Sequence, residues 1–309
     1  MRKFICKVGI FFGLLFMIDI LCGFIFGHIV NNIDQGGTGR NNYICNKVSD
    51  DFLIFGSSRA ENHYNAKMIE DSLGISCYNC GESGCGIILN YARLKMIQER
   101  KHPQIIIYEI TPNYDYLEGN NNQKYLYRLK TMYNRPGIDS IFWDIDKTEK
   151  YKMLSQLYRH NSSFLQNTLV YFTKISTDTG IKGFRPIKEP ADTMKLRKGS
   201  VIFDSKKEKY VFDPLKIDYI HKFIKESKNS KLVFAVSPVW YGQDTAVLDT
   251  IKSICQMYNI PIYDFSNDKK YVHINKYFYN GKHLNAFGAD EFTKDLIHIL
   301  KKDSVITSL

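Results

Sequence analysis

The chain begins with a long apolar stretch. Residues 8–30 read VGIFFGLLFMIDILCGFIFGHIV, in which Asp19 is the one acidic or basic side chain apart from His28. A helix of this length extends about 35 Å at ~1.5 Å per residue, which exceeds the ~30 Å hydrocarbon core of a bilayer. The sequence therefore predicts a transmembrane helix over 8–30.

Basic residues predict the orientation of this helix. Arg2, Lys3 and Lys7 precede it, and basic flanks stay on the cytoplasmic side of a membrane. We expect an uncleaved single-pass anchor, with the amino terminus in the cytoplasm and the rest of the chain outside it. The alternative is a cleaved signal peptide, whose apolar region usually covers ~7–15 residues and ends in small residues. Asp19 would mark either a membrane partner protein or a single tolerated charge.

After the apolar stretch, the hydrophobic pattern changes to short runs separated by amphipathic segments. Residues 31–50 are polar and rich in Gly and Asn, which predicts a linker. Short apolar runs then predict strands over 52–55, 75–78, 104–110, 231–236 and 260–264. Helical spacing predicts helices over 65–73, 87–100, 246–258 and 287–301.

This alternation predicts an α/β fold. Helical crossovers between strands give a mostly parallel sheet covered on both faces, so we expect a flavodoxin-like three-layer sandwich with five strands. Residues 116 to about 225 interrupt the rhythm and predict an insertion of helices and loops, with helices near 147–159 and 164–174. The predicted domain covers 51–301, and 302–309 form a tail.

Composition narrows the class of protein. Hydrophobic residues make up 44% and charged residues 24%, which excludes a disordered chain. Lys and Arg exceed Asp and Glu by 42 to 32, a net charge of +10. No nucleic-acid motif accompanies that charge, so we expect a basic face near a membrane or surface polymer and no nucleic-acid partner.

Cysteine usage gives no evidence for a disulfide scaffold or a metal site. The chain has seven cysteines, too few for a fold built on disulfides. Cys77, Cys80 and Cys85 lie close together in the sequence, but zinc usually requires a fourth ligand and a paired second motif. We therefore expect no metal ion and no organic cofactor.

Polar turns follow the predicted strands, where open α/β sheets bind their ligands. They read Gly56-Ser57-Ser58-Arg59, Gly81-Glu82-Ser83-Gly84, Thr111-Pro112-Asn113 and, before the last helix, Asn280-Gly281-Lys282-His283. Ser58 stands at a strand-to-helix turn, where the helix dipole favours an anionic intermediate. His283 is a candidate general base, and Asn113 offers a side-chain amide.

In this order the turns resemble those of the SGNH/GDSL hydrolase superfamily, over about residues 51–115 and 231–301. The resemblance implies that Ser58 is the nucleophile and that His283 is the base. It implies an oxyanion hole formed by the backbone amides of Ser58 and Gly84 and by the side chain of Asn113. It also implies that Asn280 occupies the position of the family's aspartate.

The motif departs from the family pattern at three positions. Thr111 replaces a glycine, and Ser57 replaces the Asp of the Gly-Asp-Ser turn, as in membrane-anchored members that act on cell-surface polymers. Asn280 replaces the carboxylate that would orient His283. A carboxylate from elsewhere in the chain is an open alternative, and the candidates are Asp264, Asp268 and Asp290.

The resemblance implies a membrane-anchored serine esterase or O-acyltransferase. Its substrate would be an acyl ester, chiefly acetyl, of an extracytoplasmic glycan. The alternative, suggested by Asn280, is a catalytically weakened accessory or glycan-binding protein in cell-surface polysaccharide assembly. A purely structural membrane protein would require the four turns to coincide by chance.

Overall fold

The computed structural model describes residues 1–119, 122–160, 164–174, 180–192, 196 and 210–303. Contacts divide the chain into two compact units. Unit 1 comprises Met1–Lys47 and Asn121–Asp178, and unit 2 comprises Val48–Asn120 and Thr179–Leu309.

Unit 2 is built on a five-stranded sheet. The strands are β1 (Phe52–Gly56), β2 (Cys77–Asn79), β3 (Ile105–Glu109), β4 (Lys231–Val236) and β5 (Ile262–Asp264). Their order is β2-β1-β3-β4-β5, and every neighbouring pair is parallel. This is the flavodoxin-like order, in which the direction of winding reverses between β1 and β3. The predicted α/β fold with a parallel five-stranded sheet is confirmed.

Helices and short elements surround this sheet. The helices are α3 (Ser58–His63), α4 (Ala66–Leu73), α5 (Ile87–Gln98), α6 (Pro112–Asp115), α13 (Pro214–Glu226), α14 (Asp249–Met257) and α15 (Ala286–Lys302). Two short antiparallel strands, β6 (Phe278–Asn280) and β7 (His283–Leu284), precede α15. The helix predicted over 246–258 starts as a 3-10 turn, Thr245–Leu248, and continues as α14.

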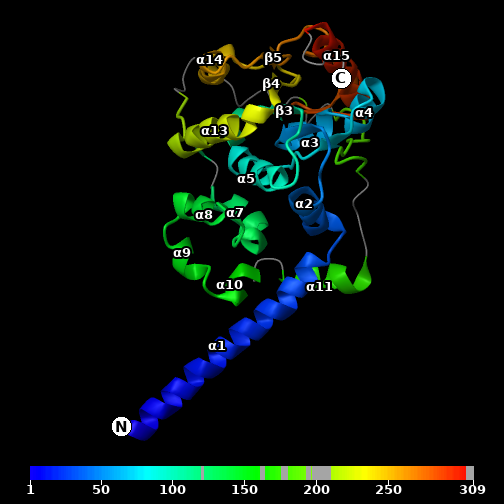
Figure 1. Cartoon of the computed structure of the whole chain (residues 1–309). Helices are drawn as coiled ribbons and strands as arrows, with labels where there is room; N and C mark the ends of the chain where they lie inside the picture. The colour runs from blue at the N-terminus through cyan, green and yellow to red at the C-terminus, as the bar shows by residue number, and fades with distance from the viewer. Residues whose placement is uncertain (120–121, 161–163, 175–179, 193–195, 197–209, 304–309) are drawn as a thin grey trace. The chain divides into compact units, whose positions relative to one another are not determined.

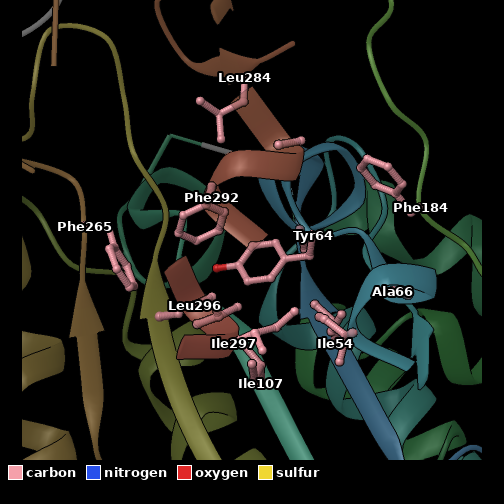
Figure 2. Close-up of a cluster of buried hydrophobic side chains, with 14 of the residues drawn as sticks. Ile54, Tyr64, Ala66, Ile107, Phe184, Phe265, Leu284, Phe292, Leu296 and Ile297 are labelled. Carbon is pink, nitrogen blue, oxygen red and sulfur yellow. The ribbon is translucent and has the colours of Figure 1, made fainter. Parts of the chain in front are cut away.

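Successive side chains of a strand point to opposite faces of the sheet, and in the central strands the side chains on both faces are buried. Ile54 and Phe292 belong to one hydrophobic cluster, which joins the sheet to α15 and is shown in Figure 2. On the other face, the ring of Phe55 packs edge-on against Phe223 of α13, with 5.5 Å between centroids. Figure 1 shows α13 beside α5, and α15 near α3 and α4. This layering explains the nearly continuous apolar strand sequences.

Unit 1 is helical. Its helices are α1 (Arg2–Asn31), α2 (Gly36–Asn46), α7 (Gln123–Leu129), α8 (Asp139–Ile145), α9 (Glu149–Lys152), α10 (Gln156–His160) and α11 (Phe164–Thr173). An 18-residue window of α1 has a mean hydropathy of 2.5, and none of it is buried. By length and composition, α1 can span a membrane, a property that signal sequences near an amino terminus share.

Two local predictions in this unit differ from the structure. Residues 36–46 of the predicted linker form α2, whose Asn42 side chain donates hydrogen bonds to the carbonyl oxygens of Val30 (2.7 Å) and Ile33 (3.0 Å). These bonds tie α2 to the last turn of α1 and to a residue just beyond it. The helix predicted over 147–159 is interrupted between α9 and α10, where Ser155 contacts α1.

Candidate active site

The turn after β1 places Ser58 at the first position of α3. Gly56 has φ +142°, a conformation that residues with a Cβ rarely adopt. A Cβ at Gly56 would also lie 2.7 Å from the carbonyl oxygen of Glu109 and 2.9 Å from Cβ of Ala60. Glycine is therefore required for the chain to turn this sharply between β1 and α3.

Ser58 and His283 are within hydrogen-bond distance, although 225 positions separate them in the sequence. The Ser58 Oγ lies 2.8 Å from Nε2 of His283 in β7. Nδ1 of the same imidazole lies 3.1 Å from Oδ1 of Asn280 in β6. The antiparallel pairing of Asn280 with His283 holds both side chains on one short hairpin.

The contacts of Asn280 define the protonation of the imidazole. Its Oδ1 accepts hydrogen bonds from the backbone N–H of Lys282 (2.9 Å) and of His283 (3.0 Å). Only an oxygen can accept these bonds, so the amide orientation is fixed. Nδ1 of His283 must then carry the proton that it shares with Oδ1, which leaves Nε2 to accept the Ser58 hydroxyl proton.

The three carboxylates considered as alternatives to Asn280 bind other groups. Asp264 accepts from Ser266 Oγ (2.6 Å) and Lys252 Nζ (2.9 Å). Asp268 accepts from the backbone N–H of Lys270 (2.8 Å), and Asp290 accepts from the side chain of Asn65 (2.8 Å). Among the described residues, Asn280 is the one with a hydrogen bond to Nδ1 of His283.

The surroundings of His283 favour its neutral form. Burial, together with the positive charges of Arg59 and Lys282, lowers the pKa of His283 to about 4, and the charge of Glu61 opposes this only in part. The imidazole is therefore uncharged at neutral pH and available as a base.

A buried polar network lies beneath these residues. Nε of Arg59 pairs with Oε1 of Glu109 at 3.0 Å, and Glu109 accepts from the backbone N–H (3.0 Å) and Oγ (2.9 Å) of Ser237. Ser237 Oγ lies 2.8 Å from Nδ1 of His63, whose Nε2 accepts from the backbone N–H of Leu284 at 3.0 Å. The network thus connects the ends of β3 and β4 to α3 and β7.

The donor and the acceptor of each hydrogen bond along this network can be assigned. Because Nε2 of His63 accepts from a backbone N–H, its Nδ1 donates to Ser237, and the Ser237 hydroxyl donates to Glu109. Burial keeps the pKa of His63 well below its usual value, and the electrostatic effects of His283 and Arg59 act in the same direction. Sequence reasoning missed Arg59, His63 and Glu109. The one sequence feature that could have indicated these residues was Glu109, a charged residue at the end of an apolar strand.

A cavity of about 110 Å³ opens beside Ser58. It is lined by Ser58, Arg59, Thr111, Pro112, Asn113, Tyr114, Val239, Tyr241, Gln243, Lys282 and His283. The same cavity is therefore lined by three of the residues predicted from the sequence, Ser58, Asn113 and His283. Asn280 contacts His283 from outside the cavity lining. A larger cavity of about 710 Å³ lies at the other end of β4, next to Leu232 and Pro261, among residues that include no acid–base pair.

Gly84 is not among the residues that line the cavity beside Ser58. It has φ +75°, in a turn closed by a hydrogen bond from the N–H of Cys85 to the carbonyl of Glu82 (3.1 Å). Gly81 is the glycine that packs against α3, since a Cβ there would lie 2.7 Å from the backbone nitrogen of Glu61. The role of Gly84 as an oxyanion donor stays a prediction.

Comparisons with known proteins assign this chain to no family and give it no activity. No protein-family model matches the chain, and no curated protein matches it. A solved structure described as "a putative platelet activating factor from Streptococcus pneumonia" aligns with 95% of this chain and 98% of its own, at 12% identity and a TM-score of 0.39. A likeness at that level assigns no activity, so the function is argued from the site geometry.

Proposed function

We propose that this protein is a membrane-anchored serine esterase or O-acyltransferase of the SGNH type. The observation that carries the proposal is the 2.8 Å contact between Ser58 Oγ and His283 Nε2, with Nδ1 of His283 oriented by Asn280. A hydroxyl, a neutral imidazole and a fixed hydrogen-bond acceptor in this order are the parts that nucleophilic acyl transfer requires.

The reaction follows from these positions. His283 Nε2 removes the Ser58 hydroxyl proton as Oγ bonds to the ester carbonyl carbon, and the carbonyl oxygen becomes an oxyanion. The Ser58 backbone amide and the Asn113 side chain, with the predicted amide of Gly84, stabilise that charge. The C–O bond to the alcohol then breaks, and His283 passes its proton to the leaving oxygen. Water or a sugar hydroxyl attacks the acyl-Ser58 ester in the same way.

Asn280 limits this mechanism without abolishing it. In serine proteases, replacing the orienting Asp with Asn lowers turnover about 10⁴-fold because the imidazole takes the wrong tautomer. Here two backbone N–H groups fix the Asn280 oxygen as an acceptor, so the tautomer is the productive one. What Asn280 lacks is the negative charge that would stabilise the protonated imidazole.

The size of the cavity supports a short acyl group. At about 110 Å³, the cavity beside Ser58 is small, which favours an acetyl group as the part of the substrate that it encloses. We propose acetyl esters of a glycan as the substrate, because α1 and the net charge of +10 suit an enzyme held near surface polymers.

We further propose that α1 is an uncleaved anchor, with the amino terminus in the cytoplasm and unit 2 outside. Its support is the apolar length of α1 and the basic residues Arg2, Lys3 and Lys7 at its start. An extracytoplasmic site would meet cell-surface glycans directly.

A fluorophosphonate probe tests the proposed nucleophile. The full chain in detergent should be labelled, and Ser58→Ala should not be. Ser72→Ala, which removes an exposed hydroxyl on α4, serves as the matched control and should be labelled like the wild type. A folded wild-type protein that is neither labelled nor active on aryl acetates would contradict the proposal.

A second function, that of a catalytically weakened glycan-binding protein, is favoured by one observation. The residue that orients His283, Asn280, is neutral, and two neighbours, Arg59 and Lys282, are cationic. Among the described residues, Glu61 alone offsets the charge of a protonated His283, and it does so only in part. Glycan binding that survives Ser58→Ala, in a chain without probe labelling, would support this function instead.

A further inference from the structure

Asp19 of α1 is bound within unit 1 to the start of α10. Its Oδ1 accepts hydrogen bonds from Ser155 Oγ (2.6 Å) and from the backbone N–H of Leu157 (2.9 Å), and its Oδ2 accepts from the N–H of Gln156 (2.8 Å). The one charge in the apolar stretch therefore has partners in its own chain. A carboxylate in an otherwise apolar helix requires such partners near a membrane.

Close packing continues along α1 beyond Asp19. A Cβ at Gly23 would lie 2.6 Å from Cγ of Gln156, so glycine permits the close approach of α10. One turn further, the ring of Phe26 packs against Phe164 of α11, with 4.3 Å between centroids. In Figure 1, α10 and α11 accordingly lie beside the carboxyl-terminal part of α1.

The polarity of α11 is the reverse of that of a helix on a water-soluble protein. Leu165, Leu169 and Phe172, spaced by four and three residues, form one stripe and are 77%, 62% and 74% exposed. On the opposite side, Asn167 is buried and accepts a hydrogen bond from Thr38 Oγ1 at 2.8 Å. Polar Asn167 and the ring of Phe164 therefore face the protein, whereas the stripe of three large apolar side chains faces outward.

The level of α11 along α1 matches the end of a bilayer. About twenty helical residues cross a ~30 Å hydrocarbon core. Counted from Phe4 or Val8, at the basic end of α1, the core ends near residue 24 or near residue 28, respectively. The contacts of α11 fall at this level, since Phe26 packs on Phe164 and His28 lies 6.3 Å from the ring of Tyr171. The contacts of α10 start deeper, at Asp19 and Gly23, and extend to Phe26, where the ring of His160 lies 6.2 Å away.

We propose that α11 is an interfacial helix. It lies in the membrane surface at the carboxyl-terminal end of α1, with Leu165, Leu169 and Phe172 in contact with phospholipid acyl chains. Interfacial helices place such a stripe roughly 5–10 Å below the headgroups.

Lipid is the occupant that fits because the stripe continues the exposed apolar surface of α1, the helix that we propose spans the membrane. Many exposed side chains of α1 between Ile10 and Ile25 are large and apolar, as are the three of the α11 stripe, and α10 and α11 pack directly on α1. Lys174, exposed at the end of α11, suits the phosphate level above the acyl chains. The inference rests on α1 being inserted in the membrane and is independent of the proposed esterase activity.

Photo-crosslinking in vesicles tests this placement. Benzoylphenylalanine replaces Leu169 or Phe172 in the full chain, reconstituted in vesicles of phosphatidylethanolamine and phosphatidylglycerol. Phe12 of α1 is the positive control, and Lys294 of α15, with a side chain 61% exposed, is the negative control. After irradiation and digestion, the α11 and α1 peptides should gain the mass of one phospholipid, and the α15 peptide should not.

Three results would overturn the proposal. Lipid adducts at Phe12 without any at Leu169 or Phe172 would show that the stripe is not in lipid. Crosslinks from Leu169 to a second protein chain would show that a protein covers it. If Phe12 also formed no lipid adduct, the anchor itself would be wrong, and α11 could not lie at its boundary. Fluorophosphonate labelling of Ser58 is measured in a separate experiment. Its result tests the esterase proposal, whereas the crosslinks test the position of α11.

Discussion

Asn280 determines how far the candidate site can act as a catalyst. It supplies an oxygen to Nδ1 of His283 and so orients the ring, but it supplies no charge. Burial and the charges of Arg59 and Lys282 disfavour the protonated imidazole and lower the pKa of His283 to about 4. The site therefore keeps a free base even in mildly acidic conditions, at the expense of base strength.

Asn280→Asp should add the missing charge. An opposite charge at this distance raises a histidine pKa by about 1–3 units and stabilises the protonated ring of the transition state, so kcat/KM should rise about ten- to hundredfold. The low-pH limb, expected near pH 4 in the wild type because protonation of His283 removes the base, should move upward with the pKa. The measurement is aryl acetate hydrolysis as a function of pH.

Asn280→Ala is the control for this substitution. It removes the oxygen that fixes the tautomer, so kcat/KM should fall. If the pH profile of Asn280→Asp matched that of the wild type, His283 would not be the group that titrates.

Glu109→Gln should destabilise unit 2 strongly. Glu109 is fully buried and pairs with Arg59, so its loss leaves a buried guanidinium without its carboxylate, which costs about 3–5 kcal/mol. Urea unfolding of the full chain in detergent measures this. Asp71→Asn, which breaks the exposed pair with Lys67, is the matched control and should cost under about 1 kcal/mol. Equal effects of the two substitutions would contradict the structural role of Glu109.

Among the elements, the strands of unit 2 were the most predictable because parallel strands buried on both faces have continuous apolar sequences. The strand predicted over 260–264 began too early in the sequence. Pro261 has no N–H to donate to a neighbouring strand, and β5 starts at Ile262. In the site, Ser58, Asn113, Asn280 and His283 could be named in advance because each follows a strand or precedes the last helix.

What the sequence could not predict depends on distant contacts. Helix α2 contains several glycines and asparagines, poor helix formers, and depends on the bonds of Asn42 to the end of α1. The interruption between α9 and α10 depends on Asp19, more than a hundred residues earlier. Likewise, His63 belongs to the site through Ser237 and Leu284, which no local pattern connects to it.

Asp19→Ala should loosen α10. The carboxylate accepts from two backbone amides at the start of this helix, and losing such a cap costs about 1 kcal/mol, or about fivefold in the local opening equilibrium. Hydrogen–deuterium exchange at Gln156 and Leu157 should accelerate by that factor. Exchange in α5 of unit 2 should not change, and unaltered exchange in α10 would contradict the assigned contact.

For the whole molecule, the account requires that α1 stays attached and holds the chain on the membrane. The protein isolated from cells should have the intact mass that includes residues 1–30, and it should remain in the membrane after an alkaline carbonate wash. A mature chain that begins after residue 30 and is released by the wash would show that the apolar stretch is a signal peptide.

The two units have different proposed tasks. Unit 1 contains α1 and the interfacial helix, and unit 2 contains the parallel sheet with Ser58 and His283 at the carboxyl ends of its strands. That is the position at which open α/β sheets bind ligands. The central claim is therefore that Ser58 and His283 act there as one catalytic unit.

Aryl acetate hydrolysis by Ser58→Ala, His283→Ala and the double variant tests that claim most directly. Residues that act as a unit have non-additive effects, so each single variant should lose at least about 10³-fold in kcat/KM and the double variant little more. Wild-type activity in either single variant, or losses that multiply in the double variant, would contradict the account.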